Sequence, residues 1–415
     1  MKITQINTFD VIGGAARAAY RLHNGLKKAG CNSNMFVRFK YSNDDSVQKF
    51  ERLHDIKSKV RRLLRRYSIK ASYSFYNSCE SNKYEPFSDD RTTDGLDILK
   101  QLPEGDLFHL HWVRKFINLP LFLNHVNAPI VLTLHDMNAF TGGCHYVSGC
   151  DRYTDSCGSC PQLNSMKKKD LSRRVWTRKK IAYNGNEKNI KVVSPSQWMA
   201  EKAKNSSLLE KIEIITIPNG IDTDIFKPRG IALRSVLNIP QNATVILFVA
   251  QKASNYRKGF NLLHKIFNEI KRKNIYLVSV GEKFTQFDFL KNHIHLGMIS
   301  NDDLLSSIYS MCDFYVMPSL EDNFPNTILE SLSCGTPVLG FNVGGINEMI
   351  IHKKNGLLAD VGDKRALREA MYYLIDHVDE RKTMRENSRR DVLDKFSLKI
   401  QAEKYIKLYN DIICR

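Results

Sequence analysis

Apolar positions along this chain fall into short continuous runs and into stripes at helical spacing. The runs predict buried strands at 2–8, 34–39, 106–111, 129–135, 190–194 and 212–217, and then at 244–251, 275–280, 293–296, 313–317 and 336–341. The stripes predict helices at 14–29, 259–273, 301–311, 364–377 and 381–413, with a break near Phe396-Ser397. Strands that alternate with helices favour parallel sheets and an α/β fold.

The pattern divides into two halves of similar kind. The segment Ile217–Pro228 carries turn residues and two prolines between them. At 415 residues the chain is long enough for two domains, each with its own core. We therefore expect a first domain at 1–216, a connection at 217–228, a second domain at 229–396 and a final helix at 397–415.

Two carboxylates flank a loop that leads from a strand into a helix. Asp322 and Glu330 stand eight positions apart in Ser319-Leu-Glu-Asp-Asn-Phe-Pro-Asn-Thr-Ile-Leu-Glu330. A helix N-terminus at the carboxyl edge of a parallel sheet favours a phosphate, whereas carboxylates favour the vicinal hydroxyls of a sugar. Together they predict a nucleotide-sugar site, although the bare spacing also fits an ordinary solvated loop.

This segment, with Pro318-Ser319 before it and Cys334-Gly-Thr-Pro-Val338 after it, resembles the E-x7-E signature of retaining GT-B glycosyltransferases of family 4, the group 1 enzymes. The resemblance implies an α/β GT-B architecture: two Rossmann-like parallel-sheet domains that face a central cleft, with the last helix crossing back to the first. It implies that Glu330 binds the donor ribose and that Asp322, in place of the family's Glu, acts on the transferred sugar. The residues that would hold sugar hydroxyls and diphosphate are Asn323, Phe324, Pro325, Asn326 and Thr327.

Two further loops match donor-site elements of that family. Gly13-Gly14 follows the first strand, where glycine lets the backbone approach a ligand, although the pair also fits simple turn chemistry. Lys252 and Lys258 border the loop after strand 244–251, and the resemblance implies that they clamp the diphosphate. Lys252 replaces an Arg and keeps its charge but not its bidentate geometry. Solvated lysines are the alternative.

Histidines end two strands of the first half. His135 follows Ile130-Val-Leu-Thr-Leu134, and His111 ends the strand before it, so both should lie at the carboxyl edge of the sheet. The resemblance places His135 near the anomeric centre, and we expect His111 on the acceptor side. A structural hydrogen-bonding role is the alternative for both.

The string His135-Asp-Met-Asn-Ala-Phe-Thr-Gly-Gly-Cys-His-Tyr146 resembles the colanic-acid branch, which builds bacterial exopolysaccharide, capsule or O-antigen units on a lipid carrier. The resemblance implies transfer of a sugar from a nucleotide diphosphate sugar to a hydroxyl of a saccharide, lipid-linked in this branch, with retention and without a divalent ion or other cofactor. Lysines and helix N-termini would stabilise charge on the departing diphosphate. That phosphate can take the acceptor proton, which we favour over a transient nucleophilic role for Asp322.

Four cysteines cluster in one short segment after these residues. Cys144, Cys150, Cys157 and Cys160 have the spacing C-x5-C-x6-C-x2-C. In a reducing cytosol four thiolates suit a structural zinc ion better than disulfides. Free thiols are the equal alternative, and a catalytic zinc is not expected because four protein ligands leave no open position.

The net charge of +18 is concentrated in the first half: residues 1–216 carry 35 Lys and Arg against 21 Asp and Glu (+14), and residues 217–415 carry 27 against 23 (+4). Clusters lie at 57–70 (seven cations, no acid) and 167–180 (eight cations, one acid). In the first cluster an apolar stripe either packs onto the domain or lies on an anionic bilayer. Its residues are Ile56, Val60, Leu63, Leu64 and Tyr67.

Other classes of protein fit the sequence less well. A nucleic-acid binder would explain the charge but not the donor-site string, so no nucleic-acid partner is expected. An epimerase of GT-B architecture is the closer alternative, whereas a phosphorylase would need a pyridoxal lysine that we do not locate. No apolar run approaches the roughly 18 residues of a spanning helix, and the N-terminus resembles a strand rather than a signal peptide. We expect a cytoplasmic protein, peripheral on the inner face of the membrane.

Overall fold

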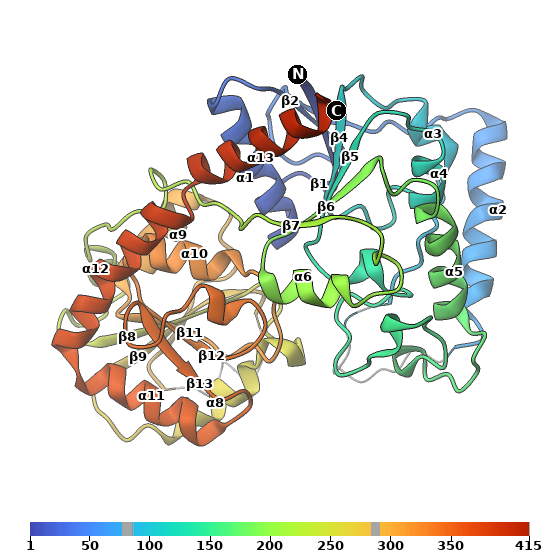
Figure 1. Cartoon of the computed structure of the whole chain (residues 1–415). Coiled ribbons are helices and arrows are strands. Elements are labelled where there is room, and N and C mark those ends of the chain that lie inside the picture. Colours follow the sequence, from blue (N-terminus) through green and yellow to red (C-terminus); the bar gives the residue numbers. More distant parts are fainter. Residues whose placement is uncertain (77–84, 86, 284–290, 415) are drawn as a thin grey trace. The chain divides into compact units, whose positions relative to one another are not determined.

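The computed structural model describes residues 1–76, 85, 87–283 and 291–414, and its chain divides into two compact units (Figure 1). Unit 1 comprises Met1–Pro218 and the segment from Gln401 on, and unit 2 comprises Asn219–Ile400. The chain thus leaves unit 1 at Pro218 and re-enters it within its last helix. Unit 1 is therefore assembled from two segments that are distant in sequence.

Unit 1 is built on a seven-stranded parallel sheet in the order β3-β2-β1-β4-β5-β6-β7. Its strands are β1 (Lys2–Phe9), β2 (Asn32–Phe39), β3 (Val47–Lys49), β4 (Leu107–Leu110), β5 (Ile130–Thr133), β6 (Ile190–Ser194) and β7 (Ile214–Thr216). Its helices are α1 (Gly14–Lys28), α2 (Ile56–Tyr73), α3 (Leu96–Leu99), α4 (Leu119–Leu123), α5 (Leu171–Tyr183), α6 (Gln197–Lys204) and most of α13 (Leu398–Ile413).

Both faces of this sheet are buried, which explains the continuous apolar runs in the sequence. On one face Ile3 and Val131 pack with Leu22 of α1 and with Tyr405 of α13. On the other face a larger core gathers residues of α4, α5 and α6 against the strands. The strand order reverses between β1 and β4, and such a switch point opens a crevice at the carboxyl ends of the strands.

Unit 2 has a six-stranded parallel sheet in the order β10-β9-β8-β11-β12-β13, with a switch point between β8 and β11. Its strands are β8 (Thr244–Ala250), β9 (Ile275–Gly281), β10 (His293–His295), β11 (Phe314–Met317), β12 (Val338–Phe341) and β13 (Gly356–Ala359). Its helices are α7 (Leu233–Val236), α8 (Phe260–Glu269), α9 (Asp302–Met311), α10 (Asn326–Ser333), α11 (Lys364–Asp376) and α12 (Val378–Lys395). Alternate residues of β8 enter separate cores on the two faces, with Val245 and Leu247 on one and Ile246 and Phe248 on the other.

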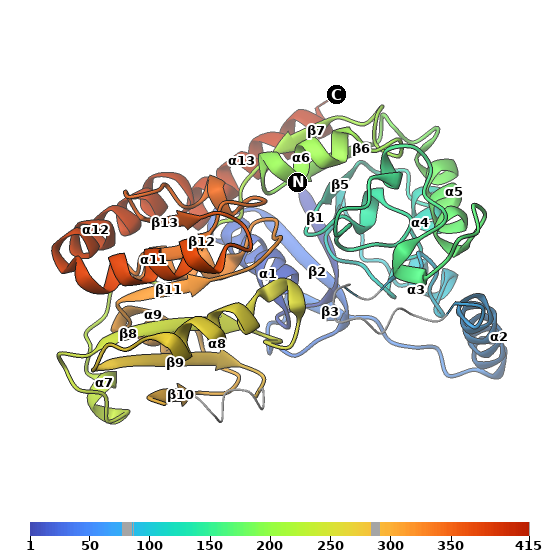
Figure 2. The same cartoon turned by 90° about the horizontal axis from the view of Figure 1, so that it is seen from below.

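Helix α2 forms an outer edge of unit 1 in both views (Figures 1 and 2). Its apolar stripe does not pack onto the domain, which corrects one of the two interpretations of the sequence: Ile56 is 79% exposed, Leu64 64% and Tyr67 62%. The helix is held by its polar face instead. Arg61 and Arg62 lie 3.4 and 4.0 Å from the buried carboxylate of Asp97. An amphipathic helix that exposes its apolar side is unusual for a surface in water alone.

Candidate active site

The loops after β8 and β11 lie at the switch point of unit 2 and carry most of the predicted donor-site residues. Lys258 belongs to the first loop and Asp322 to the second, and Lys258 Nζ lies 2.7 Å from Asp322 Oδ2. Arg257 Nη1 lies 3.1 Å from the same oxygen. The sequence pointed to Lys252 as the partner of Lys258. Lys252 is exposed, and Arg257 is the second cation at Asp322.

Asp322 is buried, and its ionisation is set by these two cations. Burial by itself raises the pKa of Asp322, but Lys258 and Arg257 outweigh burial and hold that pKa at about 2. Asp322 is therefore ionised at neutral pH. A carboxylate that shares one oxygen with two cations is a poor nucleophile and a good polar anchor.

Glycines allow the loops after β8, β11 and β12 to approach one another closely. Gly259 has φ of +67°, and a Cβ there would lie 1.8 Å from the carbonyl oxygen of Pro318. Gly344 has φ of +62°, and a Cβ there would lie 2.1 Å from the carbonyl oxygen of Asp322. A side chain at Gly259 would push against the loop after β11, and a side chain at Gly344, in the loop after β12, would push against Asp322 itself. The position of Asp322 therefore depends on glycine at both.

Glu330 lies on α10, the helix that the Asp322 loop enters. Its side chain is buried with 3% of its surface exposed, and Tyr309 of α9 donates its hydroxyl to Glu330 Oε2 at 3.0 Å. The hydroxyl of Tyr309 is a neutral donor that helps to position the carboxylate. The pKa of Tyr309 is raised, first by its burial and then by the charge of Glu330.

The residues between the two carboxylates form a buried loop and the first turn of α10. Asn323 and Phe324 are buried, Pro325 precedes the helix, and Thr327 Oγ1 lies 3.1 Å from the hydroxyl of Tyr315. Asn326 Oδ1 accepts a hydrogen bond from Asn219 at 3.3 Å. Asn219 lies in the Pro218-Asn219-Gly220 turn where unit 2 begins, so this turn supports the loop as well as connecting the units.

In unit 1, Gly13 and Gly14 lie between β1 and α1. Gly13 has φ of 94°, a conformation that favours glycine, and it precedes the first residue of the helix. A Cβ at Gly14 would meet no described atom within 4 Å. The backbone conformation at position 13 therefore favours glycine. At position 14 the described residues leave room for a side chain.

The histidines of unit 1 form one hydrogen-bonded row across neighbouring strands. His135 Nε2 lies 3.0 Å from His111 Nδ1, and His111 Nε2 lies 2.9 Å from Gln5 Oε1 of β1. His109 lies deeper, where its ring nitrogens contact Tyr409 of α13 and Thr133 at 2.7 Å each. Burial lowers the pKa of His135 to about 4, so its ring is neutral at pH 7. His111 and His135, but not His109, line a small pocket at the strand ends.

That pocket also contains charged residues that the sequence analysis did not single out. Asp136 Oδ2 accepts a hydrogen bond from Trp112 at 2.8 Å and lies 2.6 Å from His145 Nδ1. Burial raises the pKa of Asp136, but His145 and the hydrogen bonds to Asp136 lower it below its ordinary value. Lys179 of α5 reaches the pocket from the side and donates to the Thr141 carbonyl at 3.1 Å. Hydrogen-bonding side chains therefore surround His135.

The structure does not support the predicted structural zinc. Cys144, Cys150, Cys157 and Cys160 line one small cavity and are free thiols. Among the described residues, however, no group of three or more Cys, His, Asp or Glu side chains is arranged to hold a metal ion. Short spacing in the sequence brought the sulfurs near one another without orienting them as ligands of one ion. The alternative of free thiols fits this arrangement.

No helix within the described part of the chain is both long and apolar enough to cross a bilayer. The exposed stripe of α2 is amphipathic and carries seven cations over residues 57–70, which distinguishes it from a spanning segment.

Each unit is an α/β domain with a parallel sheet, and in unit 2 a carboxylate and two cations meet at the switch point of that sheet. Two domains of this kind define a protein of GT-B type. A family model described as Glycosyltransferase Family 4 matches residues 12–225, and one described as Glycosyl transferases group 1 matches residues 231–391. The first match alone covers more than half of the chain. The chain therefore belongs to this glycosyltransferase family, and the expected pair of parallel-sheet α/β domains of GT-B type is confirmed.

Curated relatives of this chain are distant in sequence. The chain is 24% identical over 208 residues to N-acetyl-alpha-D-glucosaminyl L-malate synthase of Bacillus anthracis, covering 48% of this chain and 54% of the relative. It is 23% identical over 377 residues to the putative colanic acid biosynthesis glycosyl transferase WcaC of Escherichia coli strain K12, covering 86% of each. The match spans only about half the length of the first of these relatives.

Among solved structures, the fold is similar to that of Anabaena HepE in complex with UDP-glucose. The TM-score is 0.67 at 16% identity, and the match covers 99% of this chain and 100% of that one. At this identity the likeness concerns the fold alone.

Proposed function

We propose that this protein is a retaining glycosyltransferase that moves a sugar from a nucleotide diphosphate sugar to a hydroxyl of a lipid-linked saccharide. We further propose that this step belongs to the synthesis of a bacterial exopolysaccharide, capsule or O-antigen. One observation carries the proposal: two cations of the loop after β8 meet Asp322, on the loop that leads to Glu330, at the switch point of unit 2. The cations can bind a diphosphate, and the carboxylates can bind the hydroxyls of a sugar. A site that contains both fits a nucleotide sugar better than a phosphate or a sugar alone.

Each group has a distinct role in the proposed transfer. Glu330, oriented by Tyr309, accepts hydrogen bonds from the ribose hydroxyls. Lys258 and Arg257 stabilise the negative charge that develops on the diphosphate as its bond to the sugar breaks. Asp322 holds a hydroxyl of the transferred sugar, and its ion pair keeps it charged for that contact.

The proposed chemistry is a front-face displacement that retains configuration. The bond from the anomeric carbon to the diphosphate oxygen breaks, a bond from that carbon to the acceptor oxygen forms, and the acceptor proton passes to the departing phosphate oxygen. No separate base is required. The neutral ring of His135 can bind a sugar hydroxyl without competing for that proton, because its pKa of about 4 makes it a weak base.

The lipid-linked acceptor and a peripheral position on an anionic membrane are supported by α2. Its exposed apolar stripe can enter the interface of a bilayer while its cations meet anionic headgroups. Two comparisons support the proposed pathway and donor class rather than the membrane contact. A relative that matches over 86% of this chain is named for colanic acid biosynthesis, and one neighbour in fold was solved in complex with UDP-glucose.

The proposal is tested through Glu330. Glu330→Gln keeps the shape and the contact to Tyr309 but removes the charge that strengthens hydrogen bonds to the ribose. Affinity for the preferred nucleoside diphosphate should fall by roughly 1.5–3 kcal/mol, or about 10–150-fold, in calorimetric titrations with UDP, GDP, ADP and dTDP.

Glu369→Gln is the matched control, because Glu369 lies on α11 of the same unit and pairs with Arg365. It should bind nucleotide as wild type does, and both variants should melt near the wild-type temperature. If Glu330→Gln and wild type have equal affinity for every nucleotide, the donor site has been misassigned.

A further inference from the structure

A second pocket of unit 1, about 510 Å³ in volume, lies beside α2 and is lined by cations. We call it the cationic pocket, and its charged residues are Arg38, Arg52, Lys59, Arg62, Arg66, Arg91 and Lys115. Thr92 and Thr93 add hydroxyls, and Leu63 and Ile69 add apolar surface. No described acidic side chain lines it.

Nearby carboxylates balance only part of this charge. Asp94 pairs with Arg38 at 2.9 Å and with Arg52 at 3.3 Å. Asp97 lies 4.0 Å from Arg62, and Asp89 pairs with Arg91. These three acids face four of the seven cations, and the remaining three have no carboxylate partner among the residues that the structure describes. The pocket therefore carries a positive excess, because its seven cations outnumber the three acids, two of which also pair with Arg61 and Arg178 outside the lining.

The cations also repel one another within the free protein. The pKa of Lys115 is lowered first by burial and then by the charges of Arg114 and Arg38. The pKa of Arg38 is likewise lowered by burial, and Arg52 adds to that effect against the pull of Asp94. A bound anion would relieve this repulsion, and arginine and lysine together are the donors that proteins use for phosphate groups.

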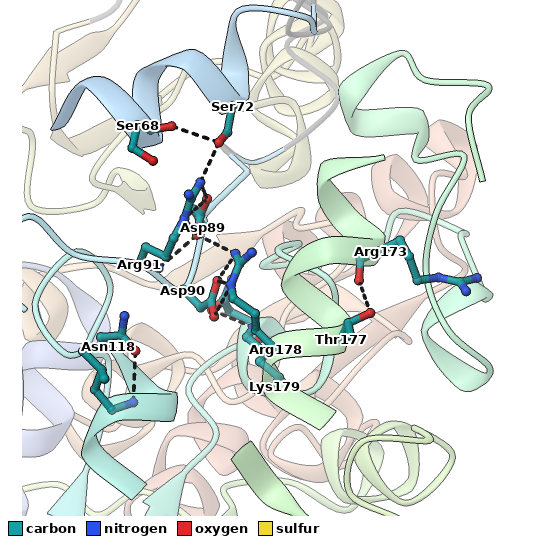
Figure 3. Close-up of polar contacts among 12 residues, drawn as sticks. Ser68, Ser72, Asp89, Asp90, Arg91, Asn118, Arg173, Thr177, Arg178 and Lys179 are labelled. Atoms are coloured by element: carbon teal, nitrogen blue, oxygen red, sulfur yellow. Dashed lines mark hydrogen bonds and ion pairs between the residues drawn. The ribbon is translucent and has the colours of Figure 1, made fainter. Parts of the chain in front are cut away.

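One side of the pocket is held by a network of ion pairs and hydrogen bonds around Arg91. Arg91 joins Asp89 to the hydroxyl of Ser72 on α2, and Arg178 of α5 pairs with both Asp89 and Asp90 (Figure 3). The figure shows these side chains converging between the two helices. Side chains held in this way lose little entropy when a ligand binds.

Two further features select the kind of anion. Leu63 belongs both to the pocket and to the exposed stripe of α2, so apolar surface leads directly out of the charged site. Lys115 lines both this pocket and the pocket of His111 and His135, so the two pockets adjoin within unit 1. A ligand that fits these surfaces has an apolar tail for the stripe of α2, a multiply charged anionic centre for the cationic pocket and a polar end for the histidine pocket.

We infer that the cationic pocket binds the diphosphate of an amphiphilic acceptor, with its lipid along α2 and its saccharide directed to the histidine pocket. This inference rests on the proposed transfer to a lipid-linked saccharide and adds the site that recognises the carrier. It does not involve the donor residues of unit 2.

The test compares two double variants of α2 that remove the same charge. Lys59→Gln with Arg66→Gln removes two lining cations, whereas Lys57→Gln with Lys70→Gln removes two exposed cations of the same helix that do not line the pocket. Binding of inorganic pyrophosphate, of detergent-dispersed farnesyl diphosphate and of phosphatidylglycerol vesicles is measured for each full-length protein. Both double variants leave the donor residues of unit 2 unchanged, so any pyrophosphate bound at the donor site contributes equally to both, and the difference between the variants reports the cationic pocket.

The lining variant should bind farnesyl diphosphate at least tenfold more weakly than wild type, and the control should stay within about twofold. Tighter binding of farnesyl diphosphate than of pyrophosphate supports a lipid source for the diphosphate. If pyrophosphate and farnesyl diphosphate bind equally well, and both depend on Lys59 and Arg66, the site is supported but its ligand is a soluble diphosphate.

Equal losses in the two variants, or loss of vesicle binding alone, would overturn the diphosphate site in favour of a general electrostatic membrane contact. Absence of diphosphate binding by wild type would overturn it as well. Failure of the proposed transfer is recognised separately, because nucleotide affinity and its dependence on Glu330 are measured in unit 2.

Discussion

Asp322 shows how two neighbouring cations set the chemistry of a single side chain. Its pKa of about 2 keeps it charged beside Lys258 and Arg257, and in the proposed site the nucleotide is bound by Glu330 instead. Asp322→Asn should therefore lower kcat by about 10–150-fold, the loss of one charge-assisted hydrogen bond, while affinity for the free nucleoside diphosphate stays near wild type. Steady-state kinetics and calorimetry on the same preparation measure the two quantities.

Asp322→Glu, which restores the family residue, serves as the control for the charge. A parallel fall in kcat and nucleotide affinity in Asp322→Asn would show that Asp322 supports the nucleotide or the loop rather than the transferred sugar.

His135 should not titrate in the physiological range. Burial depresses its pKa from about 6.5 to about 4, so the neutral ring contributes stability that is present above pH 6.5 and is lost as pH falls towards 4. The ratio of kcat/KM for wild type to that for His135→Gln should be constant between pH 6 and 8 and should fall below pH 5. An inflection of this ratio between pH 6 and 7 would mean that His135 is solvated and titrates normally.

At this scale the sequence supplied the residue types but not all the contacts. Asp322 and Glu330 were predicted from one long string and Lys258 from the loop after strand 244–251. The structure brings Lys258 and Asp322 together, and the roles of all three at a donor site stay a prediction. Arg257 was missed because the short 3-10 turn Tyr256–Lys258, rather than spacing, decides which cation reaches Asp322. Asn219 and Gly344 were missed because their contacts join segments that are distant in sequence.

Among the elements, α2 has the most direct consequence for function. Its stripe is exposed in the free protein, so polar substitutions there should change the free energy of unfolding by no more than about 0.5 kcal/mol. Val60→Ser with Leu64→Ser should nevertheless weaken binding to phosphatidylglycerol vesicles at least tenfold, because each buried aliphatic side chain contributes about 1.5–3 kcal/mol. Co-sedimentation at low and high salt, with phosphatidylcholine vesicles as the neutral comparison, measures this.

Leu393→Ser on α12 is the control, because it removes an exposed leucine of unit 2 that is not part of the α2 stripe. It should leave vesicle binding unchanged. If Val60→Ser with Leu64→Ser is recovered with vesicles as fully as wild type, α2 does not enter the bilayer.

Most elements could be predicted because strands buried on both faces have continuous apolar sequences. The short helices α3, α4, α6 and α7 were not predicted, and three other exceptions have specific causes. β3 has three residues of which only Val47 is buried, and β13 begins at a glycine. Helix α5 was read as a charge cluster because its cations obscure the buried Leu171 and Val175, and one of those cations, Lys179, is itself buried. Whether α2 was packed or exposed could not be read from periodicity, because the same stripe suits either surface.

For the whole molecule, α13 makes the stability of unit 1 depend on the end of the chain. The hydroxyl of Tyr409 lies 2.7 Å from His109 Nδ1 in the buried core. Tyr409→Phe leaves that nitrogen unsatisfied and should destabilise unit 1 by about 1–3 kcal/mol. Tryptophan fluorescence during urea unfolding reports this selectively, because Trp112, Trp176 and Trp198 all lie in unit 1.

Tyr41→Phe, at an exposed position of unit 1, should unfold as wild type does, and nucleotide affinity in unit 2 should be the same in all three proteins. A loss of nucleotide affinity in Tyr409→Phe that matches its loss of stability would show that the two units unfold as one.

The return of the chain at Gln401 also sets an order of events during synthesis. The residues up to Pro218 emerge from the ribosome first, yet the sheet face containing Ile3 and Val131 receives Tyr405 and Tyr409 only after all of unit 2 has been made. At about 5–20 residues per second that interval is on the order of 10–40 s. During it the nascent first unit carries an uncovered apolar face that a chaperone could bind, and the second unit, although translated later, can complete its core before the first.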